Sequence, residues 1–186
     1  MFHRSERLLL RPIWPEDWEA IFSGIADEGV VRNLARAPWP YEESDAREFA
    51  ALPADPLLPR FLVTRAVDAR VVGCIGLAAE DCDIPQDDEG AVELGYWIAR
   101  PYWGQGYATE AGRAVIALAR MLGHRRVVGS HFLDNPASGR VLEKLGFRPT
   151  GRRIARHSCG RGAPAMTAQY ALSLADSRRV DAVRAA

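Results

Sequence analysis

The period of hydrophobic and polar positions changes along the chain, and each change marks a predicted element. Between 107 and 122 apolar residues recur at helical spacing, which predicts an amphipathic helix; they are Ala111, Ala114, Val115, Leu118, Ala119 and Leu122. Gly123 follows as a helix stop. Segments 16–26, 44–52 and 136–144 are also predicted helices, the last opened by Asn135-Pro136.

Strand-like segments surround these helices. They are residues 6–12, 60–67, 70–78, 91–98, 126–133, 147–154 and 167–174. Gly95 inside 91–98 predicts a bulge or a close backbone approach. The order predicts an α+β (α/β) fold, with one central, mixed, mostly antiparallel sheet of about six to seven strands flanked by about four helices.

Composition narrows the function classes. The 186 residues carry 24 Lys and Arg against 24 Asp and Glu, and this balance argues against a general nucleic-acid binder. The N-terminal MFHRSERLLLRP resembles neither a signal peptide nor a membrane span. Three dispersed cysteines and four histidines show no metal-ligand spacing, so we expect no metal and a cytoplasmic protein. Residues 1–175 are expected to form one domain, followed by a polar tail at 176–186.

Two glycines precede the longest predicted helix, in the segment WGQGYATEA. Unpaired N–H groups at a helix N-terminus attract phosphate, and glycines let a ligand approach the backbone. A plain turn would use glycines as well. The segment lacks the GxxxxGK[ST] of a P-loop, and Thr109 replaces the last glycine of a dinucleotide fingerprint. Both of those interpretations are therefore weak.

The same segment resembles the acyl-CoA loop [QR]xxGx[GA] of the GNAT superfamily of N-acetyltransferases, matching at Gly106 and Ala108, with Trp103 in the first position. That departure, together with ERLLLRP, ELGYWI and NPASGRVLEKLGF, resembles the Rim-type (ribosomal-protein N-terminal acetyltransferase-like) branch across residues 5–175. The resemblance implies acetyl-CoA as acyl donor, an amine acceptor, the GNAT fold and a homodimer. The cofactor-binding residues it implies are Leu94, Gly95, Tyr96, Trp97, Gly104, Gln105, Gly106, Tyr107, Ala108, Thr109, Asn135 and Ser138.

Some of these residues also have a catalytic interpretation. Glu93 is either a solvated strand carboxylate or a base that deprotonates the acceptor, directly or through water. Ser138, or alternatively Tyr107, would protonate the leaving thiolate, although a serine in a first helical turn is unremarkable. Asn135 either caps its helix only or also contacts the cofactor.

The acceptor side is less defined. By resemblance Trp39 and Tyr41 line the acceptor cleft, with Glu93; a proline-rich loop pinned by aromatic residues is the alternative. The acidic run Glu80, Asp81, Asp83, Asp87, Asp88 and Glu89 is expected to be a solvated loop. A protein N-terminus, a polyamine, an amino acid and an antibiotic amine all remain open as acceptors. Two other functions stay open, a non-catalytic acyl-CoA-binding regulatory module and a nucleotide-binding module.

Overall fold

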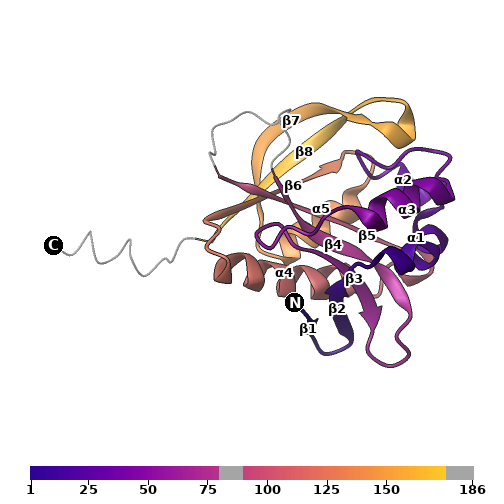
Figure 1. Ribbon diagram of the computed structural model, residues 1–186. Helices are drawn as coiled ribbons and strands as arrows, with labels where there is room; N and C mark the ends of the chain where they lie inside the picture. Colours follow the sequence, from indigo (N-terminus) through magenta and orange to yellow (C-terminus); the bar gives the residue numbers. More distant parts are fainter. Residues whose placement is uncertain (80–89, 175–186) are drawn as a thin grey trace.

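The computed structural model describes residues 1–79 and 90–174, and within them an eight-stranded sheet lies between two layers of helices (Figure 1). The strands are β1 (His3–Arg4), β2 (Leu8–Pro12), β3 (Arg60–Arg65), β4 (Val71–Ala79), β5 (Val92–Ile98), β6 (Arg126–Phe132), β7 (Arg148–Ser158) and β8 (Ala163–Ser173). The helices are α1 (Trp18–Ile25), α2 (Glu28–Val31), α3 (Glu43–Ala51), α4 (Tyr107–Met121) and α5 (Pro136–Lys144), with 3-10 turns η1 (Pro15–Asp17), η2 (Arg100–Tyr102) and η3 (Cys159–Arg161).

The sheet has the order β1-β2-β3-β4-β5-β6-β8-β7, and every neighbouring pair is antiparallel except β5 and β6. These two parallel strands pair only at Val92 with Val127 and at Glu93 with Val128. Beyond Glu93, β5 keeps its ladder to β4 but has no ladder partner on the β6 side among the described residues. The sheet therefore separates in its middle, along the second half of β5.

The predicted bulge at Gly95 is wrong. Strands β4 and β5 pair in one continuous register that places Gly76 opposite Gly95. In place of a bulge, β5 loses its pairing with β6 two residues before Gly95. The second interpretation of Gly95, that another molecule comes close to its backbone, stays a prediction. No protein atom lies within 4 Å of the place a Cβ would take, so the space beside this glycine is open.

Side chains of β5 alternate between two hydrophobic cores. Leu94 and Ile98 pack in the core beneath α4 and α5, whereas Trp97 packs in the core beneath α1, α2 and α3. The predicted stripe of α4 is buried, with Ala111, Val115 and Ala119 fully enclosed. This alternation confirms that Glu93, Gly95 and Trp97 face the α1–α3 side of the sheet.

Most predicted elements are present with bounds close to those expected, and α5 has the predicted bounds. The short elements β1 and α2 were missed because two to four residues carry no measurable period. Strands β7 and β8 are longer than predicted, and they form the long hairpin at the top of Figure 1. The acidic run at 80–89 and the tail at 176–186 lie outside the described residues. In the described part of the chain, no helix combines the length and the apolar character needed for a membrane crossing.

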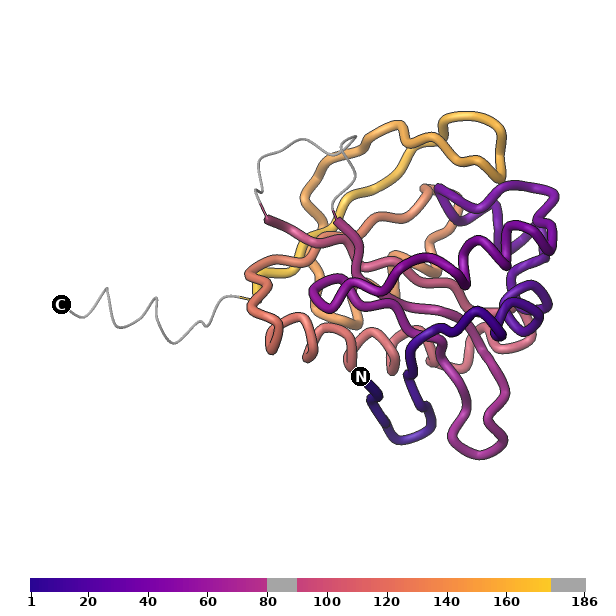
Figure 2. The backbone as a smooth tube through the Cα atoms, viewed as in Figure 1, coloured from indigo at the N-terminus to yellow at the C-terminus, as the bar shows by residue number. Residues whose placement is uncertain are grey.

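The chain path brings its beginning to the start of α4. In Figure 2 the N-terminal segment lies beside this helix, and Ser5 and Arg7 hydrogen-bond to Glu110 in the first turn of α4. The segment before β2 and the first turn of α4 therefore lie side by side.

Candidate active site

The glycine loop between η2 and α4 is held in a conformation that suits glycine. Gly104 and Gly106 have φ values of 74° and 81°, in the left-handed region. Gly106 is the N-cap residue of α4, so no capping side chain covers the N–H groups of the first helical turn. These donors can serve an anion from outside the helix.

Two side chains of the loop hydrogen-bond to the elements that precede it, β5 and η2. The Nε1–H of Trp103 donates to the carbonyl of Ile98 at 2.6 Å, and the Nε2–H of Gln105 donates to the carbonyl of Pro101 at 3.0 Å. Each fixes the loop backbone against the end of β5 or against η2. The side chain of Gln105 is thereby occupied, and its main-chain N–H is the part that remains for a ligand.

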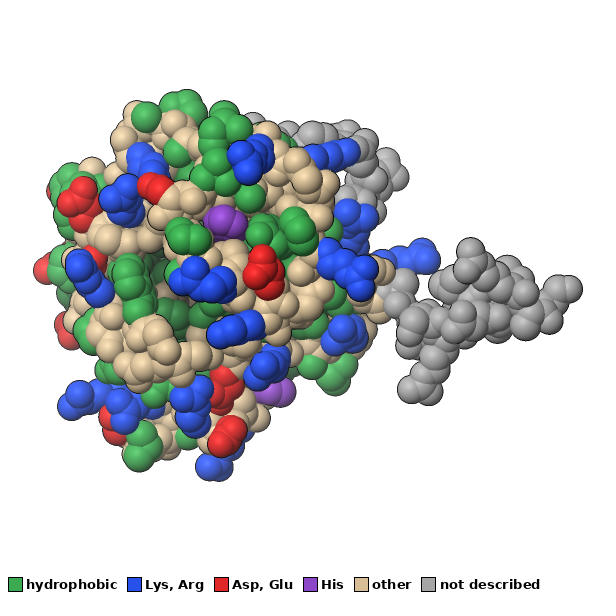
Figure 3. Space-filling view, turned by 180° about the vertical axis from the view of Figure 1, so that it is seen from behind, with side chains coloured by type: hydrophobic (Ala, Val, Ile, Leu, Met, Phe, Trp, Pro, Cys, Tyr) green, Lys and Arg blue, Asp and Glu red, His purple; other side chains and the backbone are tan. Residues whose placement is uncertain are grey.

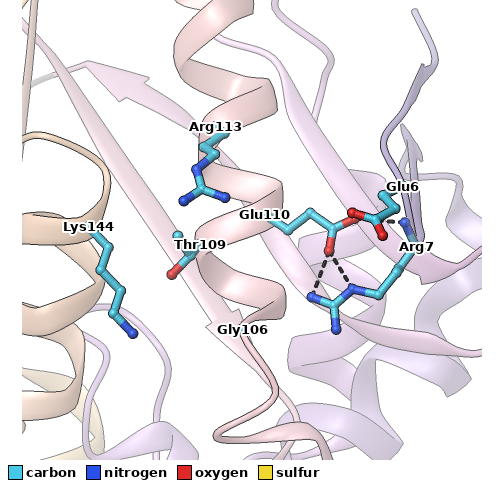
Figure 4. A pocket seen from close by; sticks show the side chains of 7 residues that line it. All are labelled: Glu6, Arg7, Gly106, Thr109, Glu110, Arg113 and Lys144. Carbon is cyan, nitrogen blue, oxygen red and sulfur yellow. Dashed lines mark hydrogen bonds and ion pairs between the residues drawn. The ribbon is translucent and has the colours of Figure 1, made fainter.

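An open pocket of about 660 Å³ lies beside this loop (Figure 4). It is lined by Glu6, Arg7, Gly106, Thr109, Glu110, Arg113 and Lys144. Arg113 of α4 and Lys144 of α5 add positive charge to that of the helix N-terminus. Seen from behind, the molecule has Lys and Arg side chains gathered beside a hollow lined by hydrophobic side chains (Figure 3). The pocket therefore offers cationic side chains next to backbone donors.

Glu110 does not cancel the positive charge of Arg113 and Lys144, because its own partners neutralise it. Burial favours the protonated carboxyl, yet hydrogen bonds from the Arg7 N–H, the Ser5 hydroxyl and the Arg7 guanidinium hold its pKa below the usual value. Arg7 and Glu110 form an ion pair at 2.7 Å.

Tyr96 and Ser138 face each other beside the open edge of β5. The phenolic oxygen of Tyr96 lies 2.7 Å from the hydroxyl oxygen of Ser138, in the first turn of α5. Burial raises the pKa of Tyr96 to about 12, although the hydrogen bond to Ser138 opposes that shift. The phenol therefore keeps its proton throughout the neutral range, and the pair can pass a proton to a base at either hydroxyl.

Asn135 is the N-cap residue of α5, as predicted. Its side-chain oxygen accepts a hydrogen bond from the N–H of Ser138 at 3.4 Å, and Pro136 occupies the first helical position. Capping thus fixes the turn that carries the Ser138 hydroxyl. A contact between Asn135 and a cofactor stays a prediction.

Glu93 is not the solvated carboxylate that one interpretation expected, because its side chain is only 11% exposed. Its two oxygens accept hydrogen bonds from Nη1 and Nη2 of Arg156 at 2.5 and 2.9 Å. Nη1 of Arg156 also donates to the hydroxyl of Ser130 at 3.0 Å. A carboxylate has about four acceptor positions, so Glu93 retains capacity for a water or an amine.

The side of the sheet that carries Glu93 opens at Gly95, which is exposed. Trp39 is 41% exposed, whereas Tyr41 is 8% exposed and packs in the core beneath α1 to α3. Burial raises the pKa of Tyr41 to about 12. Of the two aromatic residues predicted for the acceptor cleft, Trp39 is thus available at the surface and Tyr41 mainly supports its loop.

The tip of the β7–β8 hairpin is fastened to the segment after α2. Ser158 and Cys159 hydrogen-bond to the carbonyls of Leu34 and Ala35, both at 2.8 Å. Asp134, just before α5, pairs with Arg161 of the tip and with Arg32. The hairpin tip therefore lies on the side of the sheet that α2 covers.

Tyr107 lies on the loop side of the site. It is buried, contacts the Tyr102 ring edge-on, and has the Arg7 guanidinium 4.7 Å from its ring centre. Among the described residues the hydroxyl bonded to Ser138 is that of Tyr96. The structure thus brings Ser138 together with Tyr96, which favours Ser138 over Tyr107 as the proton donor.

Several residues of the site were missed by the sequence interpretation. Arg7 lies in the motif ERLLLRP, whose pattern predicts only a strand. Arg156 lies in the basic segment RRIARHS, which gives no sign of an inward-facing residue, and the strand pattern around Tyr96 gives its hydroxyl no partner. Within residues 1–79 and 90–174, no three His, Cys, Asp or Glu side chains are grouped as a metal site requires.

Comparison with known proteins gives consistent matches. Residues 7–148 match the family model described as "Acetyltransferase (GNAT) domain". The chain is 32% identical over 151 residues to the "Uncharacterized N-acetyltransferase YoaA" of Bacillus subtilis, covering 79% of this chain and 82% of the relative. It superposes on the crystal structure of an acetyltransferase (GNAT family) from Bacillus anthracis with a TM-score of 0.77 and 25% identity, over 93% of this chain and 98% of the other. The ribosomal-protein-S5-alanine acetyltransferase of Vibrio fischeri shares the fold, with a TM-score of 0.74 and 17% identity over 95% and 98% of the two chains.

Proposed function

Because the chain belongs to the acetyltransferase (GNAT) domain family, we propose that it transfers the acetyl group of acetyl-CoA to a primary amine by direct attack on the thioester. One observation carries the proposal: the open edge of β5 leads directly into a glycine-capped helix N-terminus. An extended amide chain can pair with the first feature, and a pyrophosphate can bind the second.

The donor side is assigned as follows. Main-chain N–H groups of residues 104–109 would hold the pyrophosphate, with Arg113 and Lys144 adding positive charge. The open edge at residues 94–97 would pair with the amides of the pantetheine arm. A main-chain N–H of that edge would also stabilise the oxyanion that develops on the thioester carbonyl.

The acceptor amine would approach from the side of Glu93, near the open space at Gly95. An α-amine with a pKa of about 8 is mostly protonated at neutral pH, so it must lose a proton before it attacks. Arg156 holds Glu93 in place, and Glu93 would accept that proton through an intervening water. The amine nitrogen then forms a bond to the acetyl carbon.

The leaving group departs on the side of α5. As the C–S bond breaks, the sulfur keeps the electron pair and takes a proton from the Ser138 hydroxyl. Ser138 recovers a proton from Tyr96, which lies 2.7 Å away, and Tyr96 is reprotonated from solvent. Free CoA and the N-acetylated amine are the products.

The proposal assigns the acceptor to the class of primary amines. The Vibrio fischeri protein is named for an alanine of ribosomal protein S5, so peptides with N-terminal alanine or serine are the first amines to test. We place the enzyme in the Rim-type branch and in the cytoplasm, and the homodimer stays a prediction. The comparisons give no support to a non-catalytic binding module.

A thermal unfolding experiment tests the donor. Acetyl-CoA at about 100 times its dissociation constant should stabilise the folded protein by roughly 2.7 kcal/mol. ATP and NAD at equal concentration should stabilise it far less, because neither carries a pantetheine arm for β5. Stabilisation by NAD without any by acetyl-CoA would sink the donor assignment.

A further inference from the structure

We propose that Arg7 is a positioning residue of the donor site: it sets the glycine loop and thereby makes the enzyme prefer CoA thioesters to thioesters without phosphate. This inference rests on the proposed function. Arg7 comes just before β2, whereas Glu110, its partner, lies 103 residues further along in the first turn of α4. Figure 4 shows the pair at the edge of the pocket.

One guanidinium lies beside three consecutive residues, Gln105 and Gly106 of the loop and Tyr107 at the start of α4. Nη1 of Arg7 donates to the carbonyl of Gln105 at 3.1 Å, and Nη2 lies 3.6 Å from the place a Cβ on Gly106 would take. The same group lies over the ring of Tyr107, 4.7 Å from its centre. Because the C=O and N–H of a trans peptide point in opposite directions, holding the Gln105 carbonyl towards Arg7 aims the Gly106 N–H away from it. Arg7 thus sets the direction of a donor in the loop proposed to hold the pyrophosphate.

Arg7 is itself held by a network centred on Glu110. Oε2 of Glu110 accepts from Nε and Nη2 of Arg7 at 2.8 and 2.7 Å. Oε1 accepts from the Arg7 main-chain N–H at 2.8 Å and from the Ser5 hydroxyl at 2.7 Å. The first two interactions fix the plane of the guanidinium, which a lysine ammonium cannot reproduce, and the other two hold the Glu110 carboxylate in place.

Exposure separates this role from simple stabilisation. The Arg7 side chain is 46% exposed although that of Glu110 is only 13% exposed, and solvent screening on the Arg7 side lowers what the ion pair contributes to stability. An arrangement that adds little stability yet directs a loop carbonyl is better explained by what the loop binds. The consequence falls on phosphate-bearing donors only, because the pantetheine arm is assigned to β5.

Arg11, which lies within β2 four residues after Arg7, supplies a matched control. It pairs with Asp17 at 2.6 and 2.8 Å and lies over the ring of Trp14, 4.4 Å from its centre. This pair is more buried than that of Arg7, with side chains 18% and 11% exposed. It fastens β2 to η1 rather than to the glycine loop, so its loss affects stability alone.

The experiment compares Arg7→Gln, Arg7→Lys and Arg11→Gln with the unaltered protein. Each is assayed with acetyl-CoA and with S-acetyl-pantetheine as donor, using the best amine found, and CoA binding is measured by calorimetry. For Arg7→Gln we expect KM for acetyl-CoA to rise about tenfold or more, with kcat nearly unchanged. Its kcat/KM for S-acetyl-pantetheine should stay within about twofold of the unaltered protein's, a shift too small to represent a lost hydrogen bond. Arg7→Lys should resemble Arg7→Gln, and Arg11→Gln should keep its KM.

Three results would overturn the inference. The first is an unchanged acetyl-CoA KM in Arg7→Gln, and the second is an equal loss with both donors. The third is full recovery in Arg7→Lys, which would mean that charge alone acts. All three leave acetyl transfer by the unaltered protein intact. Failure of the proposed function differs, because the unaltered protein would then bind no CoA in the calorimeter, and the inference would fall with it.

Discussion

The hydroxyl groups of Tyr96 and Ser138 lie 2.7 Å apart and join strand β5 to the first turn of α5. Strands β5 and β6 have already separated at this level, since they pair only at Val92 and Glu93 of β5. The contact places a proton-donating pair beside the edge at which the thioester is proposed to bind.

Removing either hydroxyl should slow release of the thiol. Ser138→Ala is expected to lower kcat about 10²-fold or more, because general-acid assistance is lost, with little change in acetyl-CoA affinity. Tyr96→Phe should lower kcat less, since Ser138 can still exchange protons with solvent. The defect should shrink with acetyl thioesters of more acidic thiols, whose thiolates leave without a proton.

Tyr170→Phe is the control for this experiment. Its hydroxyl donates to Glu143 at 3.4 Å, towards the other end of α5, and should not affect turnover. Equal defects for donors with acidic and ordinary thiols would show that Tyr96 and Ser138 only support the packing of α5.

The pair formed by Glu93 and Arg156 predicts a large loss of stability when it is broken. Arg156→Met leaves a buried carboxylate without its guanidinium, and the free energy of unfolding should fall by about 3–5 kcal/mol. The double variant Glu93→Leu, Arg156→Met removes both charges and should recover most of that loss. Urea unfolding of the two variants and of the unaltered protein measures both effects. A double variant no more stable than Arg156→Met would refute a coupled pair.

Turnover of Glu93→Gln tests its proposed role as proton acceptor. Because Glu93→Gln also breaks the buried pair with Arg156, activity is compared per folded protein. Near pH 7 it should fall by about 10²–10⁴-fold, because general-base assistance is lost. Raising the pH towards 9 should partly restore activity, since more of the amine is then neutral without help. If Glu93→Gln is slower than the unaltered enzyme by the same factor at every pH, Glu93 has a purely structural role.

The position of Gly106 predicts a loss of donor binding that a matched glycine does not share. Gly106 and Gly123 begin and follow α4 with nearly equal φ values, 81° and 85°. Alanine at either should lower the free energy of unfolding by about 1–2 kcal/mol, because both need the left-handed region. Only Gly106→Ala should weaken acetyl-CoA binding in calorimetry, by about tenfold or more. Equal affinities in the two variants would remove the pyrophosphate from this loop.

Asp134 predicts an acid-sensitive contribution to stability. A hydrogen bond from Arg161 holds its pKa below the usual value, although burial opposes this. The folded state therefore binds the proton less readily than the unfolded chain, so the stabilisation is present above about pH 4 and lost as the pH falls further. Because Asp134 is 47% exposed, Asp134→Asn should lower the free energy of unfolding at pH 7 by only about 1 kcal/mol. The difference should vanish near pH 2; a constant difference from pH 7 to pH 2 would exclude titration of Asp134 as its source.

The sequence predicted those features that depend on interactions between residues close together in the chain. The apolar stripe of α4, the Asn135-Pro136 opening of α5 and the glycines at 104 and 106 carry their signals within a few residues, and each lies where expected. The contacts between Glu93 and Arg156 and between Tyr96 and Ser138 span 63 and 42 residues. Nothing within either segment of the sequence identifies its partner, because the pairing follows from strand order.

The separation of β5 from β6 was missed for a related reason. Glycine within a strand is compatible with a bulge, a close approach or an open space, and the sequence of 91–98 is the same in each case. Only the position of β6, set by packing beneath α5, decides where the ladder ends. The burial of Tyr41 likewise follows from its packing beneath α1 to α3, which the sequence around it does not specify; its place in the acceptor cleft stays a prediction.

Acetyl transfer itself is measured by incubating the protein with acetyl-CoA and a panel of primary amines that includes peptides beginning with alanine and serine. Free thiol and N-acetylated amine are then quantified together, the second by mass spectrometry. We predict equal amounts of thiol and N-acetyl product with at least one amine, dependent on the protein and strongly reduced in Ser138→Ala. Binding of acetyl-CoA without an N-acetyl product from any amine, or release of thiol without such a product, would contradict the proposed reaction.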